Sequence, residues 1–143
     1  MPSAQRTVVI HRPPDEVFAF FSDPANDQRW RPHVKDIAPE APPAVGSQIH
    51  QVVEGPGGRG IAADIRISAY EPPSRYAFEV VAGPARPRGE FEFVPAADGT
   101  EVRFSLSADL GGLKGLLMGR PVQRSMDGEM AALDRAKAIL EGG

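Results

Sequence analysis

The segment FFSDPANDQRWRPHV, residues 20–34, decides the fold because it ends one short helix, forms another and leads into extended chain. It holds the only tryptophan of the sequence, Trp30, among residues that break helices. A serine and an aspartate precede Pro24 and can cap a helix there, and an Arg-Pro pair ends it. The pattern predicts two short helices, beginning at Pro14 and Pro24, with one large ring in the last turn of the second.

Short β-branched or alternating runs on both sides of this segment predict strands. Gly- and Pro-rich stretches such as GPGG, EPPS and GPARP separate the later runs. Because these connections are short, an antiparallel meander is favoured over crossover connections. The strands expected from the pattern cover residues 5–11, 34–38, 48–54, 61–70, 75–82, 89–94 and 100–109.

Four of these strands, 61–70, 75–82, 89–94 and 100–109, present one apolar and one charged face, which is typical of a sheet covered on one side. The cover is the C-terminal segment 121–141, where apolar residues recur at helical spacing. These residues are Val122, Met126, Met130, Leu133 and Leu140. The preceding GGLKGLLMGR is either a first helical portion kinked at Pro121 or a flexible lip.

Composition limits the classes of function. The net charge is −3 and no basic block stands out, which argues against nucleic acid as a partner. The chain has no cysteine, so disulfides and thiolate chemistry are excluded. The sequence shows neither the apolar segment of a signal peptide nor an apolar run long enough to span a membrane. We expect one domain over residues 1–143, located in the cytoplasm.

Three motifs that carry chemistry in other proteins have simpler interpretations here. GPGGRG (55–60) satisfies G-x-G-x-x-G, but a strand follows it instead of a helix, so a hairpin loop is favoured. The histidines His11, His33 and His50 share no metal-binding spacing. No nucleophile elbow is present, and the strand carboxylates alternate onto the charged face. We therefore expect neither a metal nor a cofactor.

The facing of strand 48–54 decides which polar side chain enters the interior. The apolar residues Ile49 and Val53 favour one face, which places Gln51 inside and His50 outside. Aromatic and methionine residues gather on the same inner surface. Periodicity alone cannot separate a filled core from a lined cavity there, because both need apolar inward residues.

Four segments together resemble the START-related superfamily, also called SRPBCC or Bet v 1-like. They are VVIHRPPDEVFAFFSDPANDQRWRP (8–32), ISAYEPPSRYAFEV (67–80), ADGTEVRFSL (97–106) and GLLMGRPVQRSMDGEMAALDRAKAILE (115–141). The chain looks most like the polyketide cyclase/dehydrase and lipid-transport group. The resemblance covers nearly the whole chain, and its motifs are mostly structural.

The resemblance implies an α+β helix-grip fold, with a seven-stranded antiparallel sheet curved around a long C-terminal helix and two short helices between the first two strands. It also implies a deep hydrophobic tunnel for a lipid, polyketide or aromatic molecule. Trp30 is expected mainly as a structural plug at its edge. The side chains expected to contact the ligand are Trp30, Gln51, Ile65, Tyr76, Phe78, Phe91, Phe93, Phe104, Met118, Met126 and Met130.

Two functions follow from the resemblance. The first is binding of a hydrophobic small molecule by a monomer or homodimer, without insertion into a membrane. The alternative is a polyketide cyclase or dehydratase, in which Tyr76 or Gln51 orients a carbonyl and His33 is the remaining polar candidate. A protein-interaction module is less favoured, because apolar residues alternate too strictly with charged ones to leave a broad exposed patch.

Overall fold

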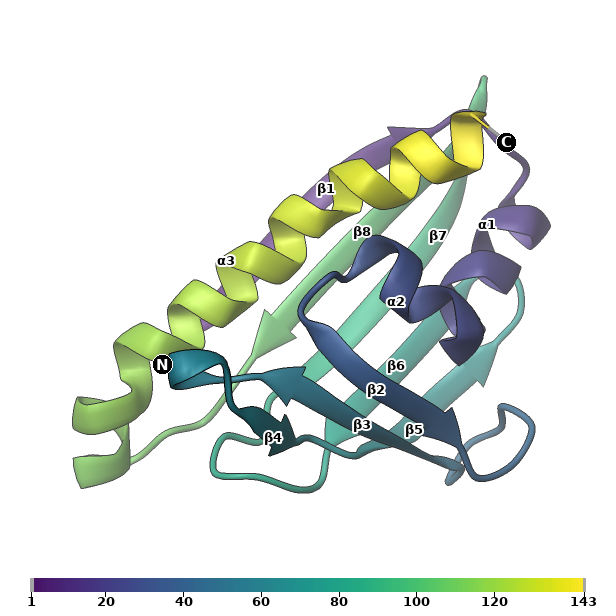
Figure 1. Cartoon of the computed structure of the whole chain (residues 1–143). Coiled ribbons are helices and arrows are strands. Elements are labelled where there is room, and N and C mark those ends of the chain that lie inside the picture. The colour runs from purple at the N-terminus through teal and green to yellow at the C-terminus, as the bar shows by residue number, and fades with distance from the viewer. Residues whose placement is uncertain (1, 143) are drawn as a thin grey trace.

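The computed structural model describes residues 2–142, and Figure 1 shows the arrangement of its elements. The expected α+β class is confirmed, with short helices between the first two strands. The elements are β1 (Ser3–Ile10), α1 (Pro14–Ser22), η1 (Pro24–Asn26), α2 (Asp27–Trp30), β2 (Val34–Pro39), β3 (Gln48–Glu54), η2 (Pro56–Gly58), β4 (Gly60–Ala62), β5 (Ile65–Glu71), β6 (Arg75–Val80), β7 (Arg88–Ala96), β8 (Gly99–Ser107) and α3 (Gly112–Gly142).

Seven strands follow one another in a curled antiparallel sheet, in the order β1-β8-β7-β6-β5-β3-β2. The short β4 pairs with β3 beside this path. β5 to β8 form the expected meander, and β1 closes against β8 with Ser3 opposite Ser107 and Ile10 opposite Thr100. The first strand therefore lies next to the last one, and β2 forms the opposite edge.

The strand expected over residues 61–70 is interrupted. β4 and β5 pair with the two ends of β3, with Ile61 opposite Val53 and Ile65 opposite Ile49. Between them Asp64 leaves the ladder, and its carboxylate accepts a hydrogen bond from the backbone N–H of Gln51 at 3.3 Å. Aspartate competes with regular pairing by bonding to nearby backbone groups, which explains why one predicted strand becomes two.

The helix α3 is longer than the 121–141 predicted for it. All of GGLKGLLMGR except its first glycine is helical, so the alternative of a flexible lip is wrong, and Pro121 lies within the helix. Proline lacks a backbone N–H and cannot complete the hydrogen-bond ladder at that point. Among residues 2–142 no helix has both the length and the apolar character required to cross a membrane.

Side chains attach α3 to the edge strand β1 along most of its length, and the two run side by side in Figure 1. Gln123 Nε2 donates to the carbonyl oxygen of Ser3 at 2.7 Å, and Arg6 donates to that of Met130 at 2.9 Å. Near the end of the helix, the Glu141 carboxylate accepts from the His11 backbone N–H at 2.9 Å. The helix is therefore fixed from Gln123 onward.

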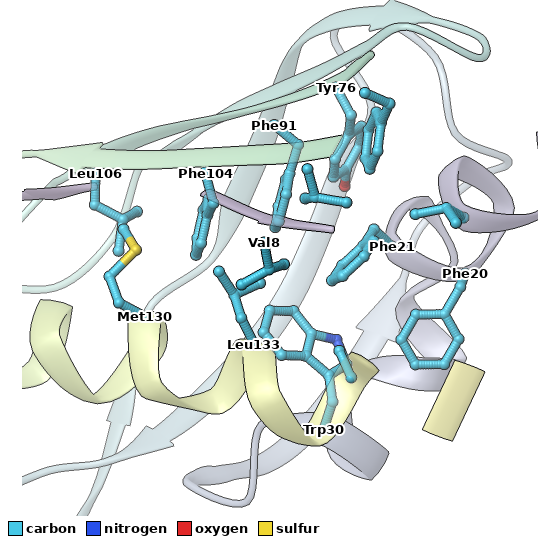
Figure 2. Close-up of a cluster of buried hydrophobic side chains, with 14 of the residues drawn as sticks. Val8, Phe20, Phe21, Trp30, Tyr76, Phe91, Phe104, Leu106, Met130 and Leu133 are labelled. Atoms are coloured by element: carbon cyan, nitrogen blue, oxygen red, sulfur yellow. The ribbon is translucent and has the colours of Figure 1, made fainter. Parts of the chain in front are cut away.

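Aromatic rings from α1, α2 and the central strands form the core beneath the helices (Figure 2). The rings of Phe91 and Phe104 are parallel, with centroids 4.1 Å apart and planes inclined by 2°. Phe21 meets Trp30 edge to face at 5.2 Å. Trp30 is 2% exposed. The space between the sheet and the helices is thus largely filled by aromatic side chains of the core.

Candidate functional site

A small cavity lies where α2, the central strands and α3 meet. Its volume is about 20 Å³, which is room for about one water molecule. This is much less than the deep tunnel expected from the resemblance, because the rings of the core occupy the space. The lining residues are Phe21, Pro24, Asp27, Trp30, Arg31, Ile49, Ile65, Tyr76, Phe78, Phe91, Phe104 and Glu129.

A glycine in β7 shapes the apolar wall of the cavity. Gly89 lies opposite Phe78, and a Cβ atom there would come within 2.5 Å of the Phe78 ring and 2.8 Å of Leu106. Only glycine leaves room for the Phe78 ring against the neighbouring strand. Tyr76 lies two residues before Phe78 and hence on the same face, with its ring centroid 6.2 Å from that of Phe91.

The polar wall is a buried ionic cluster centred on Arg31. Its Nε donates to both carboxylate oxygens of Glu129, at 3.1 and 2.9 Å, which ties the end of α2 to α3. Its Nη1 donates to Asp27 at 3.0 Å and to Gln51 at 3.3 Å. His33 forms an ion pair with Glu129. The side chains of Arg31 and Glu129 are each 10% exposed, so the pair is shielded from water.

Two carboxylates share one guanidinium in this cluster, and their pKa values move in opposite directions. Burial raises the pKa of Asp27 to about 6, although Arg31 opposes the change. Burial alone would raise the pKa of Glu129, but Arg31 and His33 bring it below its usual value. Glu129 is thus the permanent anion of the cluster, while Asp27 exchanges its proton near neutral pH.

We expect the stability of the protein to depend on pH through the protonation of Asp27. Its pKa is about 6 in the folded chain, against 3.8 for the free side chain, so the folded state binds more protons between these values. The contribution of Asp27 to the free energy of unfolding is fully present below about pH 4 and is lost as pH rises to about 6. The loss is at most about 1.4 kcal/mol per pH unit.

Urea unfolding of Asp27→Asn and wild type between about pH 4 and pH 7 measures this contribution. The variant does not titrate at this position, so its free energy of unfolding should rise relative to wild type up to about pH 6 and then stay level. Asp36→Asn, in the exposed part of β2, is the control. If the free energy of unfolding of Asp27→Asn minus that of wild type stays constant or decreases as pH rises across this range, the raised pKa of Asp27 is contradicted.

Trp30, which lines the cavity, carries a further polar group, its indole N–H. It is buried, and among residues 2–142 it has no hydrogen-bond partner. Leaving a buried donor unpaired costs about 1–3 kcal/mol, so such a group is a candidate for contact with a bound molecule. The packing of Trp30 against Phe21 and Phe91 agrees with the plug expected from the sequence.

The structure brings together six of the eleven side chains expected at the ligand: Trp30, Ile65, Tyr76, Phe78, Phe91 and Phe104 line the cavity. Gln51 is buried and bonds to Arg31 behind the wall, and His50 is exposed, so the predicted facing of β3 is confirmed. The other four do not line the cavity: Phe93, Met126 and Met130 are buried elsewhere in the core, and Met118 is half-buried near the start of α3.

Sequence reasoning missed Asp27, Arg31 and Glu129. Glu129 carried a signal, because it lies three residues after Met126 and four before Leu133, on the buried stripe of the helix. A glutamate at such a position requires a buried partner. Arg31 gave no comparable signal, since an arginine after a helix is usually solvated. Within the described chain, no group of three or more acidic or histidine side chains could hold a metal ion.

The curled sheet gripping a long helix defines a protein of the Bet v 1-like fold. The family described as polyketide cyclase/dehydrase and lipid transport matches residues 1–138, and the chain belongs to this family. A comparison with curated proteins gave no match.

Solved structures agree with this assignment of the fold. TTHA0849 from Thermus thermophilus is similar with a TM-score of 0.78 and 19% identity, over 95% of this chain and 94% of that one. Ara h 8.0201 has a TM-score of 0.77 and 11% sequence identity, over 99% of this chain and 98% of that one. DR_A0006 from Deinococcus radiodurans has a TM-score of 0.71 and 22% sequence identity, over 97% of both chains.

Proposed function

We propose that the protein binds a small hydrophobic molecule carrying a hydrogen-bond acceptor, between the sheet and α3. One observation carries the proposal: the aromatic cavity is lined by Trp30, whose indole N–H is a buried donor with no partner among residues 2–142. The family description, which includes lipid transport, supports an apolar ligand. Ile65 and Phe78 would contact its apolar part.

Binding requires the site to open, since pockets for small molecules usually measure about 300–1,000 Å³ and this cavity is far smaller. The element suited to move is α2, a single turn of four residues. Its attachment to α3 is the ion pair between Arg31 and Glu129. In our proposal, displacement of α2 widens the cavity and the ligand replaces contacts of the Trp30 ring.

The polar end of the ligand would be a carbonyl or a carboxylate. Burial raises the pKa of Tyr76 above its ordinary value, with the Asp27 carboxylate adding to the effect. The Tyr76 hydroxyl therefore stays protonated and can donate a hydrogen bond. Together with the Trp30 N–H and the Arg31 guanidinium, it makes this wall rich in donors, which suits an acceptor on the ligand.

cis-Parinaric acid is a suitable probe, because it is a long apolar chain with a terminal carboxylate and its absorption overlaps tryptophan emission. Trp30 is the only tryptophan, so quenching of its emission reports binding near α2. We expect saturable quenching of the wild-type protein. Tyr76→Phe should weaken binding roughly three- to tenfold, the effect of one hydrogen bond.

Tyr70→Phe is the matched control. Its ring centroid is 6.4 Å from that of Tyr76, but Tyr70 does not line the cavity. We expect its affinity for parinarate to equal that of wild type. Absence of energy transfer from Trp30, or equal losses in the two tyrosine variants, would refute binding at this site.

A second candidate function is a cyclase or dehydratase, and the raised pKa of Asp27 favours it. A carboxylate with a pKa of about 6 beside a donor-rich wall is suited to remove a proton next to a carbonyl near neutral pH. In this mechanism Asp27 accepts the proton, and Tyr76 and Arg31 stabilise the negative charge that develops on the carbonyl oxygen.

Exchange of the α-protons of 2-octanone with deuterated water, followed by NMR, tests the first step of this chemistry. Catalysed exchange should rise with pH through about 6 and be lost in Asp27→Asn. Asp36→Asn should retain it. If parinarate binds but wild type does not accelerate exchange above the buffer rate, binding stands and proton abstraction from a simple ketone is excluded.

A further inference from the structure

The first turns of α3 carry an apolar and basic surface that the core does not explain. Leu113, Leu116 and Leu117 are 69%, 81% and 68% exposed, which is unusual for large apolar side chains. Figure 1 shows this part of the helix at the margin of the molecule. We call the surface the α3 tip; it consists of Leu113, Lys114, Leu116, Leu117, Arg120 and Arg124.

The leucines point away from the sheet because of their position along the helix. Leu117 and the buried Val122 are five positions apart, which at 3.6 residues per turn places them about 140° apart around the axis. The apolar side of the first turns therefore differs from that of the rest of α3. The core does not account for these leucines: Met118 and Val122 of the same segment pack on it, whereas the three leucines stay largely exposed.

The charge around the leucines is positive. Between Leu110 and Met126 the sequence has three basic residues and no acidic one, in a chain whose net charge is −3. Lys114, Arg120 and Arg124 are all exposed, and none of them forms an ion pair with another residue of the range 2–142. The tip thus combines a protruding apolar group with three cations.

We propose that the α3 tip docks the protein on an anionic phospholipid surface. Exposed leucines can enter the boundary between headgroups and acyl chains, while lysine and arginine pair with anionic headgroups. Leu113 and Leu117 are largely exposed, and Leu116 borders an open hollow together with Pro2 and Leu110. A protein partner would need a surface that matches this relief, whereas a lipid surface adapts to it. Docking of this kind is peripheral and requires no spanning segment.

A second copy of the chain fits the tip less well. In a two-fold dimer each surface meets itself, so two sets of the same three cations would face each other without an acidic residue of the tip between them. The repulsion would oppose the burial of the leucines. An anionic membrane satisfies both features of the tip at once, which is why we choose it.

Sedimentation with vesicles tests the proposal, using phosphatidylcholine alone and phosphatidylcholine mixed with phosphatidylglycerol. Three cations near an anionic surface should raise the partition coefficient on the order of 100-fold on the mixed vesicles at low salt. High salt should reverse most of this gain. Binding that is equal on both vesicle types, or absent from both, overturns the proposal.

Matched variants separate the apolar and electrostatic parts. Leu116→Ser with Leu117→Ser should reduce binding to mixed vesicles at least about tenfold, whereas Val45→Ser, at a residue 66% exposed elsewhere, should not. Neutralising the three tip cations to glutamine should abolish the preference for anionic lipid. The same change at the exposed residues Arg59, Arg88 and Arg135 alters net charge equally and should have a smaller effect.

Two further measurements distinguish other occupants of the tip. Analytical ultracentrifugation that shows a dimer lost in the double serine variant, without vesicle binding by wild type, would assign the surface to a second copy. Tyr76→Phe should leave vesicle binding unchanged, because the tip is separate from the cavity. Docking can thus fail while parinarate binding stands, and the reverse also holds.

Discussion

Glu129→Ala should lower the free energy of unfolding by about 3–5 kcal/mol, because it leaves the Arg31 guanidinium buried without its main partner. Both side chains are 10% exposed, so water cannot replace the lost carboxylate without a rearrangement of α2. Asp27 and Gln51 remain near Nη1, but Nε loses both of its bonds. Urea unfolding followed by circular dichroism measures the change.

Two controls isolate the burial of the ion pair as the cause. Glu79→Ala breaks the contact with Arg66, whose side chain is 48% exposed, and should cost at most about 1 kcal/mol. Replacing both partners, Arg31→Met with Glu129→Leu, should recover much of the loss, since neither charge is then buried alone. A loss for Glu129→Ala no larger than that for Glu79→Ala would show that the cluster is hydrated.

Phe104→Ala is the second large effect, with an expected loss of about 3–5 kcal/mol in the free energy of unfolding. The ring is 2% exposed and stacks on Phe91 with centroids 4.1 Å apart. The variant leaves a void that the stiff sheet can close only in part. Thermal melts combined with urea unfolding of the purified variant give the magnitude.

Val45→Ala is the reference for this experiment, because the side chain is 66% exposed and should cost little. A loss well below the expected range for Phe104→Ala would mean that the ring lines an open tunnel in solution and contributes little packing. The same variant should bind parinarate at least as well as wild type, since it enlarges the cavity without removing a donor.

Most of the fold could be predicted from the sequence because its signals are local. Alternation predicted the facing of β3, including the inward Gln51, and proline spacing predicted where the helical segments begin. The helix expected from Pro24 is divided, however, into the 3-10 turn η1 and the single turn α2. The interruption at Asp64 was not predictable in this way, because it depends on the hydrogen bond to Gln51 across the sheet. The helical state of residues 112–120 was left open, since four glycines in and before it weaken the helical pattern.

The candidate site was harder to predict than the fold. Periodicity identifies inward residues, and six of them do meet at the cavity, but it says nothing about the space left between the rings. That space depends on packing: the stacked pair of Phe91 and Phe104 reduces it to about 20 Å³. The ionic cluster joins residues 98 positions apart, Arg31 and Glu129, so no local pattern contains it.

The pairing of β1 with β8 has a consequence for synthesis on the ribosome. Ser3 lies opposite Ser107, so β1, the first strand to be synthesised, can pair only after the last strand, β8, has been made. At ordinary translation speeds this interval is on the order of 5–20 s. Throughout it, Val8 and Ile10, which are buried in the finished protein, have no sheet to cover them. The nascent chain therefore exposes the apolar side of β1 until β8 has been synthesised.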